Sequence, residues 1–159
     1  MTDTRWLSET ELSSWLRFAA VLELLPAALD TQLSRDEGLT HFDYFTLAML
    51  SETEDMTMRM TALAALTNAT LPRLSRVVTR LEGHGYVSRT PCAEDRRATN
   101  VTLTTAGRAK VGHAAPGHVE TVRRMVIDAL SPAQVDQLST ICSQLLTRLD
   151  PDGRTFNAP

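Results

Sequence analysis

The stretch RLSRVVTRLEGHGYVSR, residues 73–89, decides the fold of this chain together with EDRRATNVTLTTAGRA, residues 94–109. Apolar residues in the first stretch recur every three or four positions, which predicts a helix with one buried face, ended by Gly83 or Gly85. YVSRT and TNVTLT alternate as strands do around an eight-residue loop, PCAEDRRA, with Val87 facing Val101 or Leu103. A shorter helix around Leu63 and Leu66 precedes them, so the order is that of a helix-turn-helix followed by a hairpin.

Further helices are expected on both sides of this unit. Six polar residues are predicted to cap helix starts: Ser8, Thr40, Thr61, Thr70, Thr104 and Ser131. Pro26 is expected to kink the first helix and Gly38 to end it, whereas Pro116 is expected to bend or break the helix after Thr104. MTMRM, residues 56–60, could form a very short strand.

Composition fits one globular domain, because the 159 residues are 43% hydrophobic and 22% charged. The first residues lack a basic region followed by an apolar run, and no segment is apolar without interruption for the roughly 18 residues that span a bilayer. We therefore expect a cytoplasmic protein with no membrane partner. Cys92 and Cys142 have no CxxC spacing, so neither a metal site nor a disulfide is expected.

Charge is distributed unevenly along the chain. The net charge is −3, but residues 59–110 hold nine basic and three acidic residues, a balance of +6 that leaves −9 for the remainder. A basic middle between acidic ends is typical of a protein with one face that meets a polyanion.

The order of elements and the two quoted motifs resemble the MarR family of winged helix-turn-helix transcription regulators. The resemblance implies a mainly α fold with a small β-hairpin wing. It also implies a homodimer in which residues 8–38 and 105–150 form the dimerisation helices and residues 40–104 form the DNA-binding domain. The function implied is that of a homodimeric repressor that binds a palindromic operator in double-stranded DNA. Leucine-rich helices at both chain ends agree with dimerisation, because a single small lobe could not cover them.

The candidate DNA contacts lie at the start of the second motif helix and in the wing. They are Thr70, Leu71, Pro72, Arg73, Ser75, Arg76, Thr79, Arg80, Asp95, Arg96 and Arg97. Arg73 and Arg76 share one helix face, and Arg is the side chain best suited to guanine O6 and N7. The resemblance implies that Arg97 enters the minor groove. Asp95 lies two residues before Arg97 and is expected to orient its guanidinium by a charge-assisted hydrogen bond. The alternative for the helix is an ordinary solvated charged face.

The resemblance also implies a small aromatic acid or phenolic effector, bound between the dimerisation helices and the winged lobe. Six residues are candidates to line that cleft, although aromatic residues at helical spacing more often belong to a core: Trp15, Phe18, His41, Tyr44, Phe45 and His113. Two alternatives remain open. One is a redox-sensing regulator that acts through Cys92 beside the wing arginines, and the other is a winged-helix module that binds only proteins. The common catalytic motifs are absent, so neither an enzyme nor a cofactor is expected.

Overall fold

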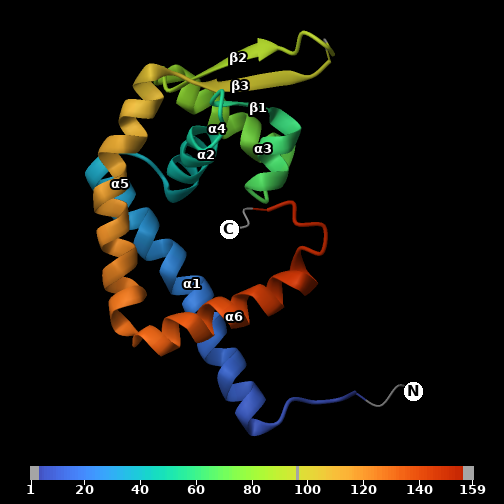
Figure 1. Cartoon of the computed structure of the whole chain (residues 1–159), viewed down its shortest axis with the longest axis vertical. Coiled ribbons are helices and arrows are strands. Elements are labelled where there is room, and N and C mark those ends of the chain that lie inside the picture. Colours follow the sequence, from blue (N-terminus) through green and yellow to red (C-terminus); the bar gives the residue numbers. More distant parts are fainter. Residues whose placement is uncertain (1–3, 96, 156–159) are drawn as a thin grey trace.

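A computed structural model describes residues 4–95 and 97–155. The elements follow the order α1 Glu9–Glu37, α2 His41–Ser51, β1 Thr57–Arg59, α3 Met60–Leu66, α4 Leu71–Gly83, β2 Val87–Pro91, β3 Thr99–Leu103, α5 Thr105–Met125, a short 3-10 helix Ile127–Ala129, and α6 Pro132–Leu149. Figure 1 shows two parts: a lobe that holds the sheet with α2, α3 and α4, and the long helices α1, α5 and α6, which extend away from it. The mainly helical fold with a small antiparallel sheet is the one that the sequence predicts.

Local capping chemistry sets most helix starts. Ser8, Thr40 and Ser131 form full capping boxes, and the Thr70 and Thr104 hydroxyls accept single backbone N–H groups.

One predicted cap is wrong. The helix α3 begins at Met60 with Arg59 as its N-cap, which makes no side-chain capping bond, so Thr61 lies inside the helix. The reason is that β1 remains paired with β3 up to Arg59, and the chain turns directly from that strand into the helix.

The wing is part of a three-stranded antiparallel sheet with the order β1-β3-β2. Val87 pairs with Leu103, the second of its two predicted partners. The short strand β1 joins the other edge of β3, which ties the wing to the helix-turn-helix. Pro91 pairs with Thr99 as the last residue of β2, so the loop begins one residue later than predicted.

The core lies between the sheet and helices α2 to α5. The predicted core side of α4 is confirmed, because four of its side chains are buried: Leu74, Val77, Val78 and Leu81. Gly107 lies in the first turn of α5. A Cβ built on Gly107 would overlap the Tyr86 carbonyl and lie 2.7 Å from Leu103 Cδ1. A side chain has no room there, and the wing and α5 can approach closely for that reason.

The two helices with a proline in their interior, α1 and α5, both continue past it. The predicted break at Pro116 is absent, since α5 is one helix from Thr105 to Met125, and a bend there stays a prediction. The kink expected at Pro26 also stays a prediction, and Gly38 ends α1 as expected with a positive φ of 64°.

The outer helices expose much apolar surface. In a single chain the large exposed apolar residues of α1 and α6 are Leu12, Trp15, Leu16, Phe18, Val21, Leu22, Leu24, Leu138, Ile141, Leu145, Leu146 and Leu149. No residue of α6 is buried. Within the described ranges, α1 is also the one helix that by length and composition could cross a membrane, although Arg17 and Glu23 interrupt its apolar surface. Exposed apolar surface of this extent is typical of a surface that contacts another protein or a membrane.

Candidate nucleic-acid interface

The first turn of α4 offers both backbone donors and basic side chains to solvent. Thr70 caps the helix by accepting the Arg73 backbone N–H at 3.4 Å, and Pro72 sits in the first turn, where its missing N–H costs nothing. Because the apolar residues occupy the opposite face, Arg73, Arg76 and Thr79 are exposed. Leu71 is 46% exposed and Ser75 is half-buried.

The three arginines on this face have different environments. The guanidinium carbon of Arg73 lies 4.2 Å from the centre of the Phe42 ring, a cation–π contact. Arg80 forms an ion pair with Asp43, whose side chain is only 4% exposed. Arg76 has neither kind of partner among the residues that the structure describes. Arg80 therefore has a structural partner that the sequence analysis missed, while the other two keep their N–H groups available.

The wing loop presents Arg97 to solvent. The Arg97 backbone N–H donates to Asp95 Oδ1 at 3.0 Å. From the sequence, the guanidinium was expected to make this contact with Asp95, but the backbone makes it. Bonds from Cys92 to Ala98 and from Ala98 to Asp95, each 2.9 Å, close the loop. Arg96, another candidate DNA contact, lies outside the described residues.

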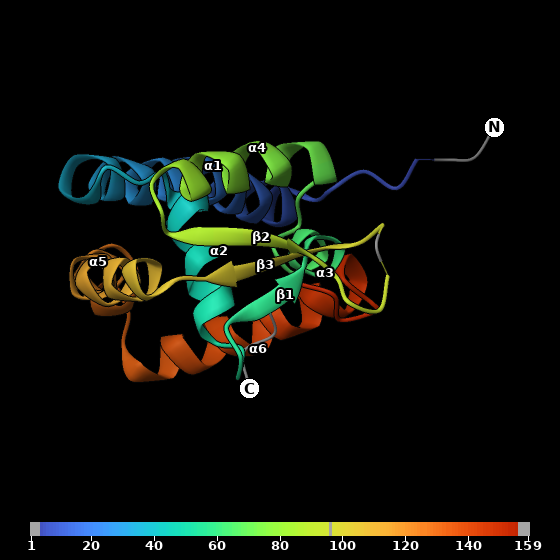
Figure 2. The same ribbon diagram turned by 90° about the horizontal axis from the view of Figure 1, so that it is seen from above.

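A small cavity of about 160 Å³ joins the wing to the start of α4. Its lining residues are Arg59, Met60, Thr61, Leu71, Arg97, Ala98 and Thr99. Seen from above in Figure 2, β2 and α4 lie side by side, and the wing tip extends toward the end where α4 begins. The first turn of the helix and the wing arginine are therefore held next to each other.

Other basic side chains near the wing are already neutralised. Arg89 binds Glu82 through its guanidinium at 2.6 and 2.9 Å and through its backbone N–H at 3.0 Å, and these bonds lower the pKa of Glu82. Arg59 pairs with Glu94 at 3.0 Å. Within the described part of residues 57–104, the arginines without a carboxylate partner are Arg73, Arg76 and Arg97, which lie on α4 and on the wing.

Known proteins that resemble this chain in sequence and fold identify its family. Residues 39–99 match the MarR family model. The MarR family transcriptional regulator Sco3205 of Streptomyces coelicolor, solved in complex with DNA, is 38% identical, with a TM-score of 0.90 over 95% of this chain and 94% of that chain. This chain belongs to the MarR family.

Two further relatives support the assignment to the MarR family. AbsC, also from Streptomyces coelicolor, is 38% identical with a TM-score of 0.86 over 92% of this chain and 98% of that one. The HTH-type transcriptional repressor YetL of Bacillus subtilis (strain 168) is 29% identical over 112 residues, which are 70% of this chain and 66% of the repressor. The protein is therefore a transcriptional regulator with the winged-helix fold of DNA-binding relatives.

The candidate effector residues of this MarR-family chain do not form one cleft within a single subunit. Trp15 and Phe18 are neighbours on α1, with ring centres 6.4 Å apart, and both are exposed. His41 lies beside Asp30, because its backbone N–H donates to Asp30 Oδ1 at 2.8 Å. Asp30 follows Trp15 by fifteen residues of helix, which is roughly 22 Å. Trp15 and Phe18 are therefore far from His41 and its neighbour Tyr44 within one chain.

His41 and Tyr44 instead meet His118 of α5, which sequence reasoning did not include among the effector residues. The His118 ring lies 5.9 Å from His41 and 4.6 Å from Tyr44, centre to centre. Burial lowers the pKa of both histidines, and the charge of His41 lowers that of His118 further. The Nδ1 atom of His118 is buried without a hydrogen-bond partner among the described residues. The three-residue spacing of His41 and Tyr44 indicated a shared face, but nothing in the sequence pointed to the α5 residue.

The remaining two candidates have structural contacts elsewhere. His113 Nδ1 lies 3.0 Å from Oε2 of Glu37, which also binds Lys110 at 2.8 Å and so links the end of α1 to α5. Phe45 is partly buried against the core.

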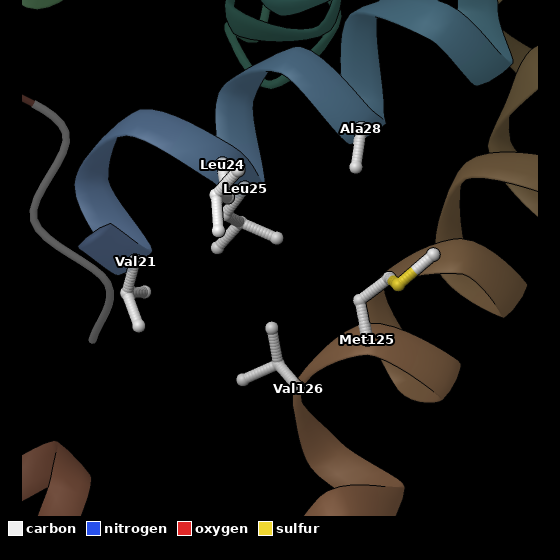
Figure 3. Close-up of a pocket in the computed structure, with 6 residues that line it drawn as sticks. All are labelled: Val21, Leu24, Leu25, Ala28, Met125 and Val126. Atoms are coloured by element: carbon white, nitrogen blue, oxygen red, sulfur yellow. The ribbon is translucent and has the colours of Figure 1, made fainter. Parts of the chain in front are cut away.

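An apolar cavity of about 220 Å³ lies between α1 and the end of α5. Figure 3 shows the six residues that line it: Val21, Leu24, Leu25, Ala28, Met125 and Val126. None of them was a candidate effector residue, because aliphatic residues at helical spacing indicate only a core.

Cys92 is buried at the base of the wing, and the Arg59 guanidinium donates to its Sγ at 3.5 Å. The backbone N–H groups of Glu94 and Asp95 lower the pKa of the Cys92 thiol, and Arg59 adds to this effect. No cluster of three or more metal-ligating side chains occurs in the part of the chain that the structure describes.

Proposed function

We propose that the protein is a homodimeric repressor that binds a palindromic operator in double-stranded DNA and leaves it when a small aromatic or phenolic ligand binds. The observation that carries the DNA part is the exposure of Arg73 and Arg76 on α4 beside Arg97 on the wing, with no carboxylate partner for any of them among the described residues. A helix start of this kind suits the major groove, and an exposed arginine on a loop suits the minor groove.

Dimerisation is supported by the uncovered apolar side chains of α1 and α6. A two-fold pairing through these helices presents two winged lobes to one face of a duplex, so the operator should contain two half-sites about one helical turn apart. We place the protein in the cytoplasm, where its DNA target lies, and assign it no enzymatic activity.

For the effector, the apolar cavity between α1 and α5 is the best-supported position in the single chain. Its volume of about 220 Å³ suffices for one aromatic ring, because an engineered apolar cavity of about 150 Å³ binds benzene. The cavity touches α1 and α5, two long helices that extend from the winged lobe. A ligand there would change the relative position of the lobes.

The test begins with duplexes selected from a random library by the full-length protein. Binding is then measured by fluorescence anisotropy at about 50 and about 200 mM salt, with the mass of the complex from light scattering. We expect two chains on each duplex, two inverted half-sites in the selected sequence, and a loss of roughly 10³ in affinity at the higher salt. A salt-insensitive complex, or one with a single chain, would contradict the proposal.

A redox function is the second candidate, and the lowered pKa of the Cys92 thiol favours it. Burial of Cys92, which is only 6% exposed, limits access of an oxidant. Peroxide treatment of the wild type and of the Cys92→Ser variant separates the two functions. Loss of DNA binding in the wild type alone would support redox sensing, and equal resistance in both proteins would exclude it.

The module that binds only proteins has less support. Leu71 is the single large apolar side chain that is substantially exposed between residues 57 and 104, within the part of that range that the structure describes. A protein-docking surface normally has an apolar core. Failure of the selection to enrich any duplex would favour this alternative.

A further inference from the structure

One turn of α2 holds the two outer arginines of the α4 face. Phe42 and Asp43 are the second and third residues of α2, and they contact Arg73 and Arg80 respectively. We propose that Phe42 is a positioning residue for DNA recognition, which holds the Arg73 guanidinium in the orientation that meets a base edge. This inference rests on the DNA-binding function proposed above, because it concerns how Arg73 reaches the duplex.

Hydrogen bonds fix the turn that carries Phe42 within α2 and attach it to α4. Asp43 Oδ2 accepts the Thr40 backbone N–H at 2.9 Å, and the Asp43 backbone N–H donates to Thr40 Oγ1 at 3.0 Å. The other carboxylate oxygen of Asp43 accepts a bond from Arg80. The Phe42 carbonyl in turn accepts a bond from the Thr46 hydroxyl at 2.8 Å. The backbone beneath the ring is therefore fixed relative to α4 before any ligand binds.

The two contacts differ in which N–H donors of the arginine they leave available. An ion pair uses N–H donors of a guanidinium, so the bond to Asp43 occupies one donor of Arg80 and ties its guanidinium to the carboxylate. Stacking on a ring uses the face of the guanidinium and leaves the N–H groups at its edge free. Arg73 is thus restrained and still able to donate to guanine O6 and N7, which Arg80 can do less well.

Restraint matters because a free arginine loses much side-chain freedom when it binds. A side chain that is already held in the bound orientation loses less, so the complex is tighter without any new contact to DNA. Arg76 is the internal comparison, since it lies three residues after Arg73 on the same helix and has no ring or carboxylate partner among the described residues.

The experiment compares Phe42→Leu with the wild type on a duplex selected by the wild type, with and without Arg73. Leucine keeps an apolar side chain of similar bulk and removes the ring. We expect a loss of about two- to fivefold per half-site, or about 4- to 25-fold for a dimer on two half-sites. The same substitution should have no effect in an Arg73→Ala background and its full effect in an Arg76→Ala background. Phe42→Tyr, which keeps the ring, should bind within about twofold of the wild type.

A role in the fold alone would give a different result. In that case Phe42→Leu would weaken binding equally in both arginine backgrounds, and this outcome would overturn the proposal. Thermal melting of each variant checks folding, and Phe42→Met provides a second replacement without a ring if the leucine variant does not fold. A wild type that binds no duplex would overturn the proposed function. A wild type that binds, while the losses caused by Phe42→Leu and Arg73→Ala simply add, would overturn only the role of Phe42.

Discussion

Replacing Arg97 by alanine should flatten the salt dependence of DNA binding, whereas replacing Arg89 should not. Both arginines are near the wing, but their charges differ in availability. Arg97 is exposed with no ion pair among the described residues, whereas Arg89 has two guanidinium bonds to Glu82. Only an arginine that is not already neutralised can release counterions from a phosphate when the complex forms.

The magnitude follows from the number of available arginines. Each subunit offers Arg73, Arg76 and Arg97, so a dimer has six such side chains. At about 0.9 per neutralised phosphate, the slope of log affinity against log salt is about −5, which is roughly a 10³-fold loss between about 50 and 200 mM salt. Removing Arg97 from both subunits should bring the slope to about −3.6 and reduce that loss to about 10²-fold.

Fluorescence anisotropy over five salt concentrations measures the slope of log affinity against log salt for the wild type, Arg97→Ala and Arg89→Ala. The Arg89→Ala variant is the matched control, because it removes the same charge from the same hairpin. A slope for Arg97→Ala equal to that of the wild type would refute the assignment of Arg97 to the DNA surface. Equal flattening by Arg89→Ala would show instead that total charge, and not the position of the free arginine, determines binding.

Three further expectations concern folding and assembly. Gly107→Ala should lower the free energy of unfolding by about 1–3 kcal/mol in urea titrations, because a Cβ would collide with the Tyr86 carbonyl; an unchanged midpoint would contradict this. Burial lowers the pKa of His41 and His118, so the unfolded chain binds more protons and stability should fall as pH drops from about 6.5 to 5. Urea titrations should show a smaller fall in His118→Asn, and an equal fall would exclude His118 as a source. Ile141→Asp should give folded single chains in light scattering, since Ile141 is 54% exposed on α6, whereas a persistent dimer would remove α6 from the interface.

Sequence was sufficient for most features that a local interaction decides, although the break expected at Pro116 did not occur. The caps at Ser8, Thr40 and Ser131 involve residues three positions apart, so their chemistry is visible in the sequence. The buried face of α4 follows from helical periodicity in the same way. The start of α3 was mispredicted because pairing of Arg59 with Asn100, 41 residues away, determines where β1 ends.

The candidate site shows the same division. Spacing placed Arg73 and Arg76 on one exposed face, which the structure confirms. It could not show that Arg80, on the same ridge, is paired with a carboxylate 37 residues earlier in the chain. His118 was missed for a similar reason, because its contacts with His41 and Tyr44 depend on how α5 packs against α2.

Hydroxyl-radical footprinting of the wild type and of Arg97→Ala on a selected operator tests the central claim most directly, because the radical reports on sugars that line the minor groove. We expect two symmetric sets of protected sugars in the wild type, and loss of the set beneath each wing in the variant while the remaining protection persists. An unchanged pattern in Arg97→Ala, or a single asymmetric footprint in the wild type, would contradict a two-fold regulator that inserts its wing arginine into the minor groove.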